Sequence, residues 1–138
     1  MSSFTTPLEF RYDDENAERS FVVDENFVYW TMSWPMTSAQ SNKLLTRGKG
    51  GECIISVKRG YATDFASIPR ILWNIFPPYH PHYTKAAVVH DFLYSYAIGD
   101  KTWADLIFLE AMTILGCPPW KRKLFYLAVK YGGRGSYG

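Results

Sequence analysis

The polar residues best suited to chemistry lie in one short segment, residues 90–94, which reads His-Asp-Phe-Leu-Tyr. The apolar spacing of residues 83–98 predicts a helix around this segment. On a helix, His90, Asp91 and Tyr94 share one stripe, because side chains three and four positions apart are neighbours. An imidazole, a carboxylate and a phenol on one face are groups that proteins use for proton transfer and cation binding.

A second carboxylate, Asp105, lies on the next predicted helix, which begins near position 100 or 102 and ends at Gly116. The connection between the two helices is short, so we expect them to be antiparallel neighbours with Asp105 facing His90. Asp105 would then fix the tautomer of His90 and stabilise the imidazolium formed when the ring takes a proton from water. The predicted catalytic residues are His90 as base, Asp105 as its orienting group, and Tyr94 as a hydrogen-bond donor that holds Asp105.

Two aspartates, Asp91 and Asp64, are the candidate metal ligands. The carboxylate of Asp91 suits a hard cation such as calcium, which would polarise a carbonyl and stabilise an oxyanion. Asp64 precedes a predicted helix, where a turn or capping role is the alternative. Zinc is less expected than calcium, because the spacing of His80, His82 and His90 matches none of the usual zinc signatures.

The pattern of His90, Asp91, Tyr94 and Asp105 resembles the active site of secreted phospholipase A2 and of the phospholipase domains of parvovirus capsids. Those proteins carry a helical His-Asp-x-x-Tyr followed by an Asp on a second antiparallel helix. The resemblance covers about residues 86–112 and implies a lipid ester as substrate, with calcium as cofactor. The chain departs from that family in having no glycine-rich, calcium-binding loop ahead of the helix.

A second resemblance covers more of the chain. Its blocks are residues 60–70, 90–94, 104–105 and 128–130. Together they are similar to a phage-associated family of small proteins of unknown function, domain of unknown function 1353. This resemblance spans about residues 54–133. It implies an origin in a tailed phage or prophage, and it implies no activity.

We expect a single α+β domain over residues 1–138, with an N-terminal antiparallel β-sheet packed against three or four C-terminal helices. Residues 1–60 are predicted to be mainly β. Strands at 21–23 and 27–30 flank Asp24-Glu25-Asn26 as a hairpin, a third strand covers 52–57, and residues 37–51 form a mobile loop.

Residues 61–133 are predicted to be mainly helical, and residues 134–138 to form a flexible tail. A short helix at 67–76 comes first, and the antiparallel pair described above follows. A last helix begins at Pro118-Pro119. Its apolar face contains Trp120, Leu124, Leu127, Ala128 and Tyr131.

Composition narrows the classes of protein that this chain can represent. A net charge of +2 gives too weak a field to indicate a nucleic-acid partner, and no segment holds 18 consecutive apolar residues, so no transmembrane segment is expected. The two cysteines, Cys53 and Cys117, have no metal or disulfide spacing and are predicted to be buried thiols.

Two functions are the main hypotheses for these observations, and an intracellular effector that binds a host protein or nucleotide is a third alternative. The first is a phage-encoded hydrolase that acts on an ester or amide of the host envelope, a lipid ester being preferred. The alternative is a non-enzymatic virion component of the tail or baseplate, whose partners are other virion proteins and whose His-Asp-Tyr cluster is a structural network. In either case the chain would be made in the host cytoplasm, and in the second it would be incorporated in the virion.

Overall fold

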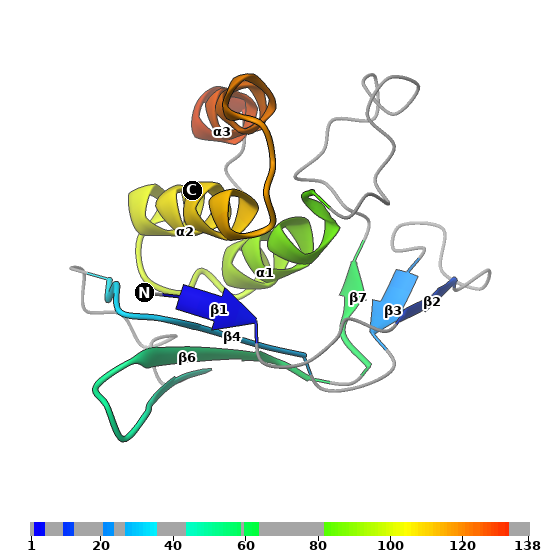
Figure 1. The fold of residues 1–138 in the computed structure, drawn as a ribbon. Helices are drawn as coiled ribbons and strands as arrows, with labels where there is room; N and C mark the ends of the chain where they lie inside the picture. The colour runs from blue at the N-terminus through cyan, green and yellow to red at the C-terminus, as the bar shows by residue number, and fades with distance from the viewer. Residues whose placement is uncertain are drawn as a thin grey trace.

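A computed structural model describes residues 2–4, 10–12, 21–23, 27–35, 44–58, 60–63 and 82–132 (Figure 1). The strands in this part of the chain are β1 (Ser2–Phe4), β2 (Phe10–Tyr12), β3 (Phe21–Val23), β4 (Phe27–Thr31), β5 (Leu45–Arg47), β6 (Cys53–Val57) and β7 (Ala62–Thr63). The helices are α1 (Thr84–Ser95), α2 (Lys101–Ile114) and α3 (Pro119–Gly132). The chain is therefore α+β, as predicted.

The strands form two antiparallel sheets, with the orders β1-β4-β6-β5 and β2-β3-β7. In β4 and β6, buried residues alternate with half-buried ones, which is the pattern of a sheet covered on one face. The helices α1 and α2 cover that face of the larger sheet, and α3 lies on the far side of α2 (Figure 1).

The predicted hairpin between residues 21–23 and 27–30 is wrong. Strand β3 pairs with β2 and β7, whereas β4 pairs with β1 and β6. The β4–β6 ladder joins five residue pairs, from Phe27 with Val57 to Thr31 with Cys53. In a hairpin with β3, only the three residues of that strand could pair with β4. Strand β6 is the better partner, because its ladder with β4 is longer.

The predicted mobile loop at residues 37–51 is also wrong in part. Residues 45–47 form β5, which pairs with β6, and the glycine-rich residues 48–51 make the turn of this hairpin. Gly51 has a φ of 83°, a conformation that glycine adopts without steric cost. Three other predicted features, the rest of the loop at 37–43, the helix at 67–76 and the tail at 134–138, lie outside the described residues.

The ends of the helices follow local signals in the sequence. The side chain of Asp100 caps α2 by accepting a hydrogen bond from the backbone N–H of Trp103 at 3.2 Å. Gly99, just before it, has a φ of 65°, and a Cβ there would lie 2.7 Å from the Trp103 ring and 2.8 Å from Pro35. The turn between α1 and α2 therefore requires glycine at this position.

The last helix turns a different face to the core than its composition suggests. Phe125 and Val129 are buried, and the ring of Phe125 meets that of Tyr83 edge-on at 4.8 Å. Most of the face predicted to be apolar is exposed to solvent, namely Trp120, Leu124, Leu127 and Tyr131. Helix α3 thus carries apolar side chains on two sides.

Candidate functional site

The antiparallel packing of α1 and α2 brings the three predicted catalytic residues together. His90 Nε2 lies 2.8 Å from Asp105 Oδ1, and the hydroxyl of Tyr94 donates to the same oxygen at 2.6 Å. The contacts expected between these side chains are therefore present. The short turn after α1 makes them possible, because it sets the two helices side by side in a register that faces Asp105 toward His90.

Lys101, which is not among the residues predicted from the sequence, completes the cluster. Its ammonium group donates to Asp105 Oδ2 at 2.8 Å and to the backbone carbonyls of Val129 and Lys130 at 3.0 and 2.9 Å. The spacing of Lys101 and Asp105, four positions apart on a predicted helix, is the signal that could have revealed their ion pair. The bonds to α3 depend on tertiary packing and leave no local signal.

The surroundings of Asp105 keep its carboxylate charged. Burial by itself would raise the pKa of Asp105, but hydrogen bonds from His90, Lys101 and Tyr94 outweigh it, and the pKa lies below its usual value. Both carboxylate oxygens accept hydrogen bonds from these three donors. Asp105 is thus an ionised group fixed in position, as a residue that orients a histidine must be.

His90 is held tightly and almost completely enclosed. Its ring stacks on that of Phe108 with 4.8 Å between the ring centroids, and the centroid of the Tyr94 ring lies 4.1 Å away. The residue is 1% exposed. Because the ionised Asp105 accepts a hydrogen bond from Nε2, the neutral ring carries its proton on Nε2. In this tautomer the lone pair of the ring is on Nδ1.

The predicted cation site is only partly within the described residues. Asp91 is 8% exposed on α1, and Asp64 and His80 lie outside the part of the chain that the structure describes. Within that part, no group of three or more His, Cys, Asp or Glu side chains is arranged to hold a metal ion. The described residues therefore do not form a complete set of ligands around Asp91, and calcium binding stays a prediction.

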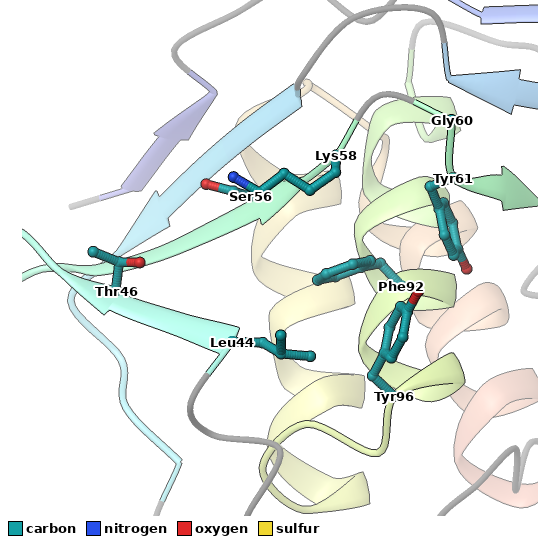
Figure 2. A pocket seen from close by; sticks show the side chains of 8 residues that line it. All are labelled: Leu44, Thr46, Ser56, Lys58, Gly60, Tyr61, Phe92 and Tyr96. Atoms are coloured by element: carbon teal, nitrogen blue, oxygen red, sulfur yellow. The ribbon is translucent and has the colours of Figure 1, made fainter.

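A cavity of about 530 Å³ lies between the β5–β6 hairpin and the C-terminal end of α1 (Figure 2). Its aromatic wall consists of Tyr61, Phe92 and Tyr96. Phe92 and Tyr96 occupy the side of α1 opposite His90 and Tyr94, since two positions on a helix correspond to a rotation of about 200°. The cavity therefore does not open onto the His90–Asp105 pair.

No helix in the described residues is both long and apolar enough to cross a bilayer. Both cysteines are buried and free, as predicted.

The chain thus combines an α+β fold with a cluster across its helices in which His90 and Asp105 are buried and Tyr94 and Lys101 are half-buried. The model of one family, described as a protein of unknown function (DUF1353), matches residues 39–129. The chain belongs to this family, which confirms the resemblance carried by the four sequence blocks. No curated protein matches the chain. No solved structure matches it either.

Proposed function

We propose that this chain is a phage-encoded hydrolase that cleaves an ester, preferentially a lipid ester, of the host envelope. The observation that carries the proposal is the 2.8 Å contact between His90 Nε2 and Asp105 Oδ1. It is supported by the lowered pKa of Asp105, where burial is outweighed by hydrogen bonds from His90, Lys101 and Tyr94. A histidine oriented by an ionised carboxylate is a general base for the activation of water.

In this mechanism, His90 Nδ1 takes a proton from a water molecule while the water oxygen attacks the ester carbonyl. The negative charge of Asp105 stabilises the imidazolium that forms. As the carbon–oxygen bond to the alcohol breaks, the imidazolium returns the proton to the departing oxygen, which yields a carboxylic acid and an alcohol. Tyr94 and Lys101 act as positioning residues, because both donate hydrogen bonds to Asp105.

The burial of the cluster favours a second candidate, a non-enzymatic virion component. His90 is 1% exposed, and Lys101 connects Asp105 to the backbone of α3. A polar network that joins three helices and satisfies its own hydrogen bonds stabilises a fold without any chemistry. In that case the chain would travel in the phage particle and contact other virion proteins.

The two candidates separate in one experiment. Wild type, His90→Ala and the control His82→Ala are incubated with vesicles of phosphatidylethanolamine and phosphatidylglycerol, with and without calcium, and released fatty acid is measured. The hydrolase predicts turnover by the wild type and the control, and its loss in His90→Ala. If the wild type is folded and inactive on these lipids, the proposal fails.

Stability measurements on the same proteins address the structural candidate. If His90 acts only in the network, His90→Ala destabilises the fold by roughly 1–3 kcal/mol and no turnover is seen in any variant. If the variant loses both turnover and stability, the pH–rate profile of the wild type decides. Catalysis is supported if the rate rises with pH as one group loses its proton in the range where histidine titrates. A pH–rate profile without that step contradicts catalysis.

A further inference from the structure

Four exposed apolar side chains form one stripe along α3. Trp120 is 62% exposed and Tyr131 is 78% exposed, and Leu124 and Leu127 are exposed between them. Their spacing of four, three and four positions places all four on one side of the helix, away from the buried Phe125. This exposed stripe lies on the helix farthest from the larger sheet (Figure 1).

The charges of α3 have a single sign. The helix contains Lys121, Arg122, Lys123 and Lys130 and no acidic residue. Lys123 and Lys130, both exposed, lie next to the exposed stripe when the helix is viewed along its axis, and Lys121 lies on its other side. Three of these cations are in the first turns, where the helix macrodipole disfavours positive charge, so an anionic partner would offset an existing repulsion.

We infer that the exposed stripe of α3 docks on an anionic lipid surface. An apolar stripe bordered by lysines, with a tryptophan at one end and a tyrosine at the other, has the composition of helices that lie in a membrane interface. The lysine stems can extend along the apolar surface while their ammonium groups reach the phosphates, and the aromatic rings suit the level of the headgroups.

Other occupants fit the same surface less well. A second copy of the chain would bring two sets of like charges together across an interface that contains no acidic residue from α3. A nucleic acid would satisfy the lysines and leave the apolar stripe in water. An anionic bilayer interface satisfies both features at once.

Vesicle flotation tests the inference and does not depend on catalysis by His90. The wild-type chain is mixed with vesicles of phosphatidylcholine alone or with added phosphatidylglycerol. We expect the chain to bind the anionic vesicles roughly tenfold more tightly than the vesicles of phosphatidylcholine alone, since each lysine near an anionic surface adds attraction. Failure to bind anionic vesicles would overturn the inference and leave the proposed hydrolase to be judged on its own assay, including soluble esters.

Three variants identify the surface involved. Leu124→Gln with Leu127→Gln removes the middle of the stripe, and Lys123→Gln with Lys130→Gln removes the adjacent charge. Each pair should reduce vesicle binding about tenfold or more. The control Met32→Gln changes an exposed apolar residue just after β4 and should bind like the wild type. Equal binding by all variants would contradict docking through α3.

The unfolding midpoints and circular dichroism of the variants must match those of the wild type, which is expected because the changed side chains are exposed. Two further measurements detect the other occupants. Sedimentation in the absence of lipid should show a monomer; a dimer that the leucine variant abolishes would assign the stripe to a second copy and overturn the inference. Retention on DNA without vesicle binding would overturn it as well.

Discussion

The ammonium group of Lys101 lies 2.8 Å from Asp105 Oδ2, one helical turn away on α2, and also donates to the carbonyls of Val129 and Lys130. One side chain therefore forms an ion pair with the carboxylate that His90 contacts and, at the same time, holds the C-terminal end of α3. The positions of the candidate base and of the last helix are connected through Lys101.

Replacing Lys101 should weaken both of its connections. Lys101→Met keeps the length of the side chain and removes three hydrogen bonds, so we expect the free energy of unfolding to fall by roughly 1–3 kcal/mol. Urea unfolding measures this loss, and hydrogen exchange should quicken near the end of α3. Lys123→Met, at an exposed site on α3, should change stability by no more than about 0.5 kcal/mol. Equal effects of the two substitutions would contradict the role given to Lys101.

Asp105 should make the stability depend on acid pH. Its folded-state pKa lies below the usual value, because the hydrogen bonds from His90, Lys101 and Tyr94 outweigh the effect of burial. Its stabilising contribution is therefore complete above the unfolded pKa of about 3.9, and is lost as the pH falls through the folded-state value.

We thus expect wild type to be more stable than Asp105→Asn at neutral pH, with the difference shrinking below about pH 4. Thermal unfolding of both proteins at a series of acid pH values measures how this difference in stability depends on pH. A difference that is constant with pH would show that Asp105 is not ionised in the way described.

Asp91 provides the test of the predicted cation. Titration calorimetry with calcium and then with zinc should show calcium binding to the wild type, and its loss in Asp91→Asn. Asp64→Asn should weaken the same binding if both aspartates are ligands. The control Asp100→Asn changes the cap of α2 to another good capping residue and should bind as the wild type does. Calcium binding that survives Asp91→Asn would place the ion elsewhere.

The two thiols should be unreactive in the folded chain. Burial raises the pKa of Cys53 to about 12 despite the nearby Arg47, and burial also raises that of Cys117 despite Lys121 and Arg122. Ellman's reagent at mildly alkaline pH should therefore find both cysteines only after denaturation. Because these values are raised, the thiols favour folding below their unfolded pKa of about 8.5, and this contribution declines as the pH rises further. Rapid labelling of a native thiol would contradict the burial.

Much of the helical half could be predicted from the sequence, because its signals are local. Gly99, Asp100 and Gly116 mark where α1 ends and where α2 begins and ends. A short turn between two predicted helices was enough to bring Asp105 opposite His90. The contact between these two residues followed from periodicity and the length of the connection.

The remaining features depend on contacts that local sequence does not encode. Which strand pairs with β4 is decided by the five-residue match with β6 and not by the polar turn after Val23. The inward face of α3 could not be chosen from composition, because Trp120 and Phe125 mark two apolar sides of one helix. The bonds of Lys101 to α3 depend on which face of α3 packs inward, so they could not be predicted either.

The pairing of β4 with β1 and β6, and not with β3, also affects the order in which the chain folds. Ser2 pairs with Thr31 and Phe27 with Val57, so the larger sheet, apart from the β5–β6 hairpin, forms through contacts between distant parts of the sequence. The members of the His90–Asp105 pair are only 15 positions apart in the sequence. Short-range contacts form faster than long-range ones, so we expect the helical hairpin, with its histidine already oriented, to assemble before the sheet beneath it.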